Sequence, residues 1–572
     1  MKKYTNTALA SVLAASLLAG CSSSTPASSA AASSAGSAGS AGSEAAPASS
    51  AAETTPSGDQ ILKFGLSGFE GVFNPILSDN VYDSYCTSLM FDGLVDVDST
   101  GNYVPELATW ELSDDHLTYT FTMIDGPTFS NGSPVTTDDV AFTYNTIKEE
   151  DYAGPRTNVG AAIASIEVID DKTIAFTMTD PSPANLQNFT YGILDDEYYA
   201  HSSFEELAAK NNEPMGCGIV TFDGWAAKQY VNMVKNDTYY GDQLKIDGIQ
   251  FLHVEEDGIL GALQNGEIDF CQPAAKAENV EAVDGMDNSH LVSYLANGYT
   301  FMCFNTTRAH TAEIPVRQAL LYALDRKNFL TAEYGSEELV SLGMAPISKT
   351  SWAYPGDDEL NAYDFDLEKA AALLDEAGWT LNESTGIREK DVNGDGEIKA
   401  EDYETMELNW LVYYDATWPG TLSGMAFDSW GQIGVKLNIS TMDFNTVASE
   451  TMDAKPGEKD FDIYTMGFSL SVDPDPTGGL FDADAYSEGG FNASGWRNDH
   501  AQELMKAGLT EFDQAKRAEI YKEWAIIQNE EVPTAIVAYR SEIWGINNRV
   551  HGLDDIGVYT DFTEIIQNVT LD

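Results

Sequence analysis

The chain has 572 residues and carries 30 Lys and Arg against 91 Asp and Glu, a formal net charge of −61 at pH 7. A field of this sign repels phosphate backbones and anionic lipid surfaces, so the composition excludes nucleic-acid binding. With 43% hydrophobic and 11% aromatic residues, the region after Gly58 is long and apolar enough to bury a large core and to form more than one domain.

Residues 1–20 have the parts of a bacterial lipoprotein signal peptide. Lys2 and Lys3 give a positive start, residues 8–19 are uncharged and mostly apolar, and the small residue Gly20 precedes Cys21. The apolar stretch is short for a membrane span. The pattern predicts cleavage before Cys21, lipidation of its thiol, and a protein held by lipid on the extracytoplasmic face of the cell membrane.

Residues 21–58 are predicted to be the lipidated cysteine and a disordered tether. Residues 22–58 consist almost wholly of Ser, Ala, Gly, Pro and Thr, and only Glu44 and Glu53 are charged. No aromatic or large aliphatic side chain is present that could anchor a core. The length of this tether favours a location on a Gram-positive cell surface over one in a periplasm.

The chain lacks the sequence motifs of the common hydrolases, metalloproteases and nucleotide-binding enzymes. It has no G-x-S-x-G, H-E-x-x-H or Walker pattern, and its seven histidines are scattered. The remaining cysteines show no CxxC spacing, which argues against a zinc site or redox pair but leaves one or two disulfides open: Cys86, Cys217, Cys271 and Cys303. We therefore expect a binding protein, with an anchored extracellular hydrolase as the disfavoured alternative.

Strand and helix patterns alternate along the part of the chain after the tether. Residues 61–66 form an apolar run typical of a buried strand, and residues 82–91 carry apolar side chains at helical spacing. Residues 117–123 alternate as a strand, and Thr137-Asp138-Asp139 is expected to cap a helix that starts at Val140. This alternation indicates an α/β protein.

Residues 91–147 hold an ordered series of short motifs. They are Gly93-Leu94-Val95, Pro105-Glu106-Leu107-Ala108, Trp110-Glu111, Tyr119-Thr120-Phe121, Gly132-Ser133-Pro134-Val135-Thr136 and Asp139-Val140-Ala141-Phe142-Thr143-Tyr144. The series resembles the signature region of the peptide/nickel class of ABC-transporter solute-binding proteins. Further motifs extend the resemblance over nearly all of the mature chain: Asn265-Gly266-Glu267-Ile268-Asp269, Val316-Arg317-Gln318-Ala319-Leu320 and Glu376-Ala377-Gly378-Trp379.

The resemblance implies an α/β, two-lobed fold of the type II periplasmic-binding-protein kind, with an extra subdomain in the first lobe and a hinged cleft between the lobes. We expect lobe I over residues 59–101, 213–304 and 535–572, the extra subdomain over 102–212, and lobe II over 305–534. The two chain crossings that form the hinge are expected near Asn305 and near Val532.

The resemblance also implies the function of an ABC-importer receptor. Such a receptor captures oligopeptides or dipeptides in its cleft as a monomer and delivers them to permease and ATPase subunits. Another extended solute, such as an oligosaccharide or a metal chelate, remains an alternative cargo, and a receptor that signals or chaperones without transport remains an alternative role.

In relatives, two chain segments close on the ligand backbone. Here the first corresponds to Asp79, Asn80 and Val81, and the second follows a Gly-aromatic pair in the far lobe and comprises Phe468, Ser469, Leu470 and Ser471. Backbone pairing of this kind tolerates many ligand side chains.

Aromatic side chains and one acid complete the expected site. Five aromatic residues could either line pockets for ligand side chains or pack in the core: Tyr299, Phe301, Tyr413, Tyr414 and Trp418. In peptide-binding relatives a carboxylate holds the ligand's amino group, but Ser471 stands at that position. The nearest acid, Asp473, is either the amine ligand or the structural Asp of an Asp-Pro turn.

Residues 391–402 fit the pattern of a calcium-binding loop, with oxygen-bearing side chains at positions one, three and five and Gly at position six. Lys399 at position nine and an Asp in place of Glu at position twelve depart from the pattern, and an acidic hairpin is the alternative. The candidate ligands of a structural calcium ion are Asp391, Asn393, Asp395, Glu397 and Asp402. We expect no required cofactor.

Replacing Cys21 by Ser should abolish lipidation and release the protein into the medium, because one cysteine carries the predicted anchor. Detergent partition of membrane and medium fractions measures this change. A variant that stays in the membrane phase would refute the lipoprotein interpretation.

Overall fold

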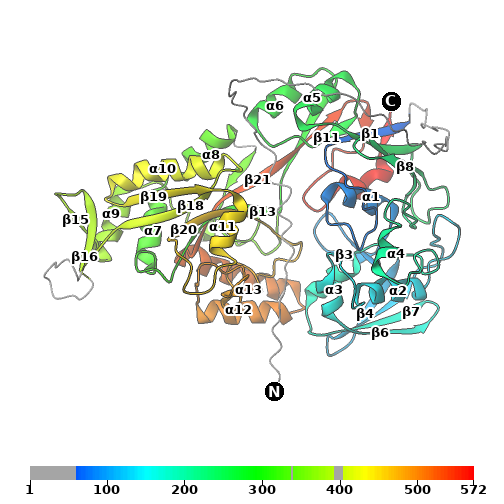
Figure 1. Ribbon diagram of the computed structural model, residues 1–572, viewed down its shortest axis with the longest axis horizontal. Helices are drawn as coiled ribbons and strands as arrows, with labels where there is room; N and C mark the ends of the chain where they lie inside the picture. Colours follow the sequence, from blue (N-terminus) through cyan, green and yellow to red (C-terminus); the bar gives the residue numbers. More distant parts are fainter. Residues whose placement is uncertain (1–59, 337–338, 392–402) are drawn as a thin grey trace, which may run out of the picture.

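The computed structural model describes residues 60–336, 339–391 and 403–572, which form two lobes side by side (Figure 1). Each lobe has its own large hydrophobic core. The two-lobed α/β fold that the sequence predicts is thereby found.

One sheet runs through both lobes in the strand order β19-β18-β20-β13-β21-β11-β1-β10-β9-β8, with β12 and β14 also paired to β21. The strands on the lobe II side are β13 (Gly298–Phe304), β14 (Val340–Leu342), β18 (Glu407–Tyr413), β19 (Lys436–Met442) and β20 (Ile463–Ser469). Those on the lobe I side are β1 (Ile61–Leu66), β8 (Val220–Ala226), β9 (Tyr230–Lys235), β10 (Gly248–His253), β11 (Phe270–Cys271) and β12 (Ser289–Leu295). The long strand β21 (Thr534–Asn547) belongs to both.

Helices cover this sheet in each lobe. Lobe I has α1 (Val81–Met90), α4 (Phe204–Ala208), α5 (Glu256–Asn265), α6 (Ala277–Asp284) and α14 (Phe562–Ile565), with the short strand pairs β2 (Val95–Val97) with β3 (Tyr103–Pro105) and β22 (Val550–His551) with β23 (Thr570–Leu571). Lobe II has α7 (Ile314–Tyr322), α8 (Arg326–Tyr334), α9 (Leu367–Glu376), α10 (Trp418–Gln432), α11 (Phe444–Thr451), α12 (Asp499–Thr510) and α13 (Gln514–Glu531).

A separate antiparallel sheet forms the extra subdomain of lobe I. Its strand order is β4-β5-β7-β6, and helices α2 and α3 accompany it. The bounds are β4 (Ala108–Leu112), β5 (Thr118–Met123), α2 (Thr137–Ile147), α3 (Thr157–Ala162), β6 (Ile163–Asp170) and β7 (Thr173–Met178). Helix α2 starts earlier than expected, because Thr136 and Asp139 form a capping box.

The chain crosses between the lobes at two adjacent points that differ from the sequence prediction. Residues 534–538 of β21 pair with β13 in lobe II, whereas residues 541–547 pair with β12 in lobe I. The second crossing joins β12 to β13 at Ala296 and Asn297. Residues 538–540 of β21 also pair with β14 of lobe II. The crossings expected near Asn305 and Val532 therefore lie at 296–297 and 540–541, because β13 and the first half of β21 pack in the lobe II core.

Asp269 and Arg317, two residues of the motifs quoted above, are buried and form hydrogen bonds with the main chain. The carboxylate of Asp269 accepts the backbone N–H of Lys63 at 2.8 Å and pairs with Arg549 at 2.6 and 2.9 Å, which ties β1 to the segment after β21. Arg317 is 2% exposed and donates to four backbone carbonyls, those of Thr311, Ala312, Glu531 and Val532. It thus satisfies the C-terminal end of α13.

The four described cysteines are all buried and unpaired, so the disulfides left open by the sequence do not form among Cys86, Cys217, Cys271 and Cys303. Within the described part of the chain, no helix has the length and apolar character to cross a bilayer.

A three-stranded sheet, β15 (Thr380–Asn382), β16 (Ile387–Asp391) and β17 (Tyr403–Thr405), flanks the candidate calcium loop. Asp391 is the last residue of β16, and its backbone pairs with that of Tyr403, the first residue of β17. Asn393, Asp395, Glu397 and Asp402 lie outside the described residues, and calcium binding stays a prediction.

Replacing Arg317 by Met should lower the free energy of unfolding by about 3 kcal/mol, because buried carbonyls at the end of α13 lose their donors. Urea denaturation measures the loss. Lys516→Met on the same helix is the control, since its side chain is 69% exposed and its loss should change stability by less than about 0.5 kcal/mol. Equal stability of the two variants would contradict the anchoring role.

Candidate ligand-binding cleft

A cavity of about 860 Å³ lies between the two lobes. Lobe I lines it with the end of β1, one face of α1 and residues of the 557–564 segment, while lobe II contributes Tyr299, Phe468 and Val472. Ala296, Asn297 and Arg540 of the two crossings also line it. A rotation about the crossings therefore changes the width of this cleft directly.

The lobe I segment expected to extend along a ligand backbone leads into helix α1. Asn80 is the N-cap with an extended backbone, and its side-chain oxygen accepts the backbone N–H of Tyr82 at 2.8 Å and of Asp83 at 3.4 Å. Asp79 is exposed outside the helix, and Val81 is the first helical residue. Of the three residues only Val81 lines the cleft, and pairing of this segment with a ligand backbone stays a prediction.

The lobe II segment is divided between the ligand cavity and the hinge. Phe468 and Ser469 line the cleft. The backbone N–H of Leu470 donates to the carbonyl of Asn297 at 2.9 Å, and the Asn297 amide donates to the carbonyls of Leu470 and Ser471 at 3.1 and 2.9 Å. These backbone groups therefore hold the segment to a crossing rather than to a ligand.

The five expected aromatic residues lie in three different environments. Tyr299 lines the cleft and stacks on Phe468 with ring centroids 6.0 Å apart. Phe301, Tyr413 and Trp418 are buried in the lobe II core, so for these the core-packing alternative holds. Tyr414 is 63% exposed and does not line the cavity.

Asp473 is engaged by lobe II itself. Its two carboxylate oxygens accept from Arg517 Nη1 at 2.5 Å and Nη2 at 2.7 Å, and one of them also accepts the backbone N–H of Asp475 at 3.0 Å. The Asp473 side chain is 7% exposed. This pairing favours the alternative that Asp473 is the structural Asp of the Asp-Pro turn, and it gives no support to the assignment of Asp473 to a ligand amine.

An acidic and aromatic wall that the sequence did not predict lies on the lobe I side of the cleft. Its carboxylates come from the short β2 strand, from β21 and from the start of α14, and the rings come from α1 and β12. Arg540 is the one basic residue among the described residues that line the cleft. The wall consists of Asp96, Glu542, Asp561, Glu564, Tyr82, Tyr85 and Tyr294.

Burial raises the pKa values of two carboxyl groups of this wall, Asp561 and Glu564. Desolvation raises the pKa of Asp561 to about 6, with the charge of Glu542 adding to the shift. Desolvation also raises the pKa of Glu564 to about 9, and the nearby carboxylates of Asp96 and Asp561 raise it further. A charged residue within the apolar pattern of β21, such as Glu542, is the signal in the sequence that could have identified the wall.

A second contact joins the lobes away from the crossings, where α12 and α13 approach the extra subdomain (Figure 1). The rings of His116 and Phe512 lie 4.0 Å apart, and Gln514 Nε2 donates to Asn102 Oδ1 at 3.0 Å. A smaller cavity of about 260 Å³, lined from both lobes, adjoins this contact. The cleft is thus bounded by the two crossings and by a direct lobe-to-lobe contact.

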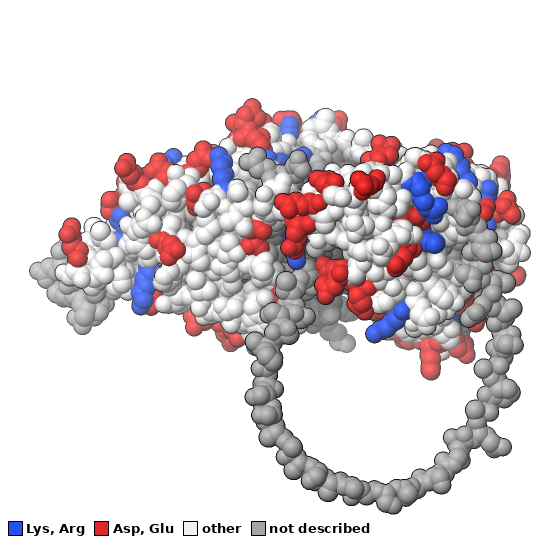
Figure 2. Space-filling model, turned by 90° about the horizontal axis from the view of Figure 1, so that it is seen from above, with Lys and Arg blue, Asp and Glu red and all other residues white. Residues whose placement is uncertain are grey.

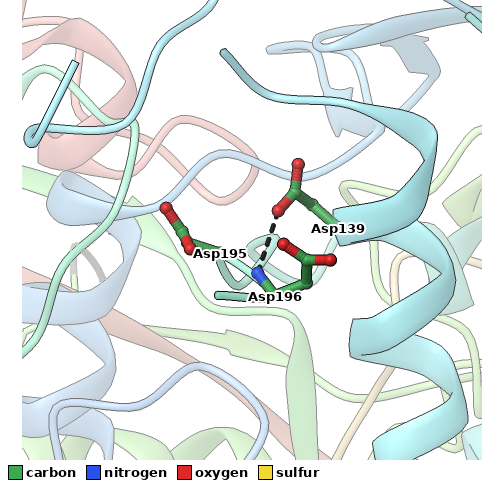
Figure 3. Close-up of side chains that lie close together, drawn as sticks. All are labelled: Asp139, Asp195 and Asp196. Carbon is green, nitrogen blue, oxygen red and sulfur yellow. Dashed lines mark hydrogen bonds between the residues drawn. The ribbon is translucent and has the colours of Figure 1, made fainter. Parts of the chain in front are cut away.

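Three aspartates outside the cleft lie close enough together to resemble a cation site (Figure 3). Asp139 accepts the backbone N–H of Asp196 at 2.9 Å and caps α2 through Thr136. Asp195 accepts from Tyr198 N–H at 2.7 Å and Ser133 Oγ at 2.8 Å. Through these hydrogen bonds Asp139 and Asp195 hold the neighbouring loops in place, and no metal is assigned to them.

The rest of the described surface is also acidic. Figure 2 shows Asp and Glu side chains outnumbering Lys and Arg over the visible face. This distribution agrees with the net charge of −61 and favours cationic over anionic solutes near the protein.

Replacing Asp473 by Asn should destabilise lobe II by about 3–5 kcal/mol, because it leaves the guanidinium of Arg517 buried without a counter-charge. Thermal or urea unfolding measures the loss, and the double change Asp473→Leu with Arg517→Met should recover part of it. Unchanged stability together with weaker binding of ligands that have a free amine would show that Asp473 serves the ligand after all.

Comparison with known proteins identifies the family. The family model of the bacterial extracellular solute-binding proteins, family 5 Middle, matches residues 102–488. Oligopeptide-binding protein AppA of Bacillus subtilis is 25% identical over 481 residues, which cover 83% of this chain and 84% of the relative. Di/tripeptide-binding protein 1 of Pseudomonas aeruginosa is 28% identical over 497 residues, which cover 81% and 85%.

The fold is shared with solved structures. That of a putative peptide binding protein, AppA, from Clostridium difficile matches with a TM-score of 0.75 at 22% identity and covers 90% of this chain and 100% of the other. The two-lobed fold inferred from the motifs is thereby confirmed. Because the family model spans more than half of the sequence, the chain belongs to the bacterial extracellular solute-binding proteins of family 5, which bind their solutes without transforming them.

Proposed function

We propose that this protein captures short peptides in its interlobe cleft and presents them to the permease of an ABC importer. The observation that carries the proposal is the cleft itself, which both lobes and both crossings line. A solute that contacts both lobes binds the closed form more tightly and shifts the population toward it. The permease and its ATPase subunits would recognise that closed form.

Peptide cargo is supported by the relatives and by the chemistry of the cleft. Two relatives whose alignments cover more than four-fifths of this chain are named for binding oligopeptides and di/tripeptides. The cavity volume of about 860 Å³ falls in the range of about 300–1,000 Å³ that is usual for small-molecule sites. Its tyrosine, phenylalanine and carboxylate lining suits a solute with both apolar and charged groups.

We also propose that lipid on Cys21 anchors the protein to the extracytoplasmic face of the membrane as a monomer. The anchor would keep the cleft close to a permease in the same membrane.

Protein purified without refolding should release short peptides of mixed sequence when it is denatured, as measured by mass spectrometry of the released fraction. Phe468→Ala should weaken rebinding of those peptides at least about tenfold, because it removes a ring that lines the cleft. Tyr414→Ala is the control, since that ring is exposed and lies outside the cleft. Release of an oligosaccharide or a metal chelate would overturn the cargo assignment and leave the receptor role standing.

A further inference from the structure

The acidic wall of lobe I forms no ion pair within the described part of the chain. Among the described residues, no Lys, Arg or His pairs with Asp96, Glu542, Asp561 or Glu564 within the 4.0 Å that defines an ion pair. The neighbours that the structure gives Glu542 are neutral donors. Tyr294 OH and Gln272 Nε2 donate to Glu542 at 2.7 and 2.9 Å. A set of half-buried carboxylates without a cation is costly to the folded state.

Two of the other three carboxylates of the wall accept backbone N–H groups. Asp561 accepts the N–H of Thr563 at 3.1 Å as the N-cap of α14, and Asp96 accepts the N–H of Val97 at 2.8 Å. Burial is the first cause of the raised pKa values of Asp96, Asp561 and Glu564. Ionisation of these three groups therefore costs more than it would in water.

Tyrosine rings lie among these carboxylates. Tyr82 and Tyr85 project from α1 and Tyr294 from β12, and all three line the same cavity. The charges of Asp561 and Glu542 act on Tyr85, and Tyr294 bonds Glu542 directly, so the rings and acids form one cluster. Aromatic faces attract ammonium and guanidinium groups and repel anions.

One basic side chain also lines the cleft. Arg540, on the crossing, lies 6.0 Å from the ring centroid of Tyr334, and its Nε is buried without a partner in the described chain. A guanidinium with a free donor is suited to a carboxylate or carbonyl of a ligand. The described lining of the cleft thus offers an acidic wall and, two residues before Glu542 on β21, a single basic group.

We propose that the carboxylate and tyrosine wall of lobe I is a subsite for a cationic group of the bound peptide, either its terminal ammonium or a Lys or Arg side chain. The inference rests on the proposed function, because it assigns a ligand charge to the same cleft. It places cation recognition on lobe I, whereas the lobe II acid Asp473 is neutralised by Arg517. An organic cation brings its own charge into the wall and removes the cost of burying the carboxylates.

Four pentapeptides test the proposal by isothermal titration: Ala-Ala-Lys-Ala-Ala and Ala-Ala-Gln-Ala-Ala, each with a free and with an acetylated amino terminus. The acetylated Gln peptide has no cation and should bind the wild type at least about tenfold more weakly than the tightest of the other three. Comparison of the remaining peptides shows whether the terminal ammonium or the Lys side chain supplies the cation.

The double variant Glu542→Gln with Glu564→Gln keeps the shape of the wall and removes two carboxyl groups that could ionise against a cation. The tenfold preference for a cationic peptide should fall below about threefold in this variant. Glu205→Gln is the matched control, since Glu205 is an exposed acid on α4 that does not line the cleft, and it should keep the full preference.

A second measurement needs no ligand. Because the pKa of Glu564 is raised in the folded state, the native protein binds more protons than the unfolded chain above about pH 4, and stability falls as pH rises through the folded-state pKa. Glu564→Gln removes a carboxylate that faces Asp96, Asp561 and Glu106, so the melting temperature at pH 8 should rise by about 1–2 °C. If the role of Glu564 were purely structural, Glu564→Gln would instead lower the melting temperature.

The outcomes separate this subsite from peptide capture in general. Equal affinity of the wild type for all four peptides would overturn the subsite and leave the proposed function intact. Failure of every peptide to bind would overturn both. A rise in melting temperature with nickel or calcium chloride alone, abolished in the double variant, would show that the wall holds a metal ion and would also overturn the proposal.

Discussion

The structure depends on one strand that belongs to both lobes. Strand β21 pairs with β13 in lobe II over residues 534–538 and with β12 in lobe I over residues 541–547. Beside it, the two-residue link 296–297 carries the chain back, and the Ala296 N–H donates to the Arg540 carbonyl at 2.9 Å. Strand β14 of lobe II pairs with residues 538–540, so the pairing of β21 changes from lobe II to lobe I at the step between Arg540 and Ser541. Because backbone hydrogen bonds must be kept on both sides, a bend between the lobes is confined to this step. Both residues of the step line the cleft.

Asn297 shows how closely the hinge and the site are connected. Its amide group donates to the carbonyls of Leu470 and Ser471, while its own carbonyl accepts the N–H of Leu470. The residue also lines the cleft. A ligand that touches this crossing therefore acts on the same residues that set the angle between the lobes, and this contact gives the closed form its own binding energy.

Local patterns in the sequence predicted the local structure well. The strand at 61–66 and the α1 helix follow from apolar spacing, and the family motifs gave the two-lobed fold. The N-cap role of Asn80 was not predicted although a local signal was present: Asn followed three residues later by Asp83 and then by apolar residues is typical of a helix N-terminus. The resemblance to a ligand-binding segment outweighed that signal.

The remaining differences between prediction and structure come from contacts that the sequence does not contain. Asp473 and Arg517 are 44 residues apart in the chain, so counting from a motif could not show that they pair. The hinge was misplaced because β21 is one continuous strand, and nothing local says that its two halves belong to different lobes. Phe301 and Tyr413 are aromatic in the same way as Tyr299, and only the packing decides which ring faces the cleft.

The same dependence on distant contacts explains why the acidic wall escaped notice. In a chain with 91 acidic residues, single carboxylates carry no information, and Asp96 is far in the sequence from Glu542 and Glu564. These carboxylates differ from structural ones because the described chain gives them no cationic partner. Asp269 is more deeply buried than they are, yet it has Arg549 as a partner and it fastens β1, so it is structural. Carboxylates that a fold gathers in a ligand cavity and leaves without a cation weaken the empty protein, and a ligand that supplies the missing charge gains in affinity what the empty protein loses in stability.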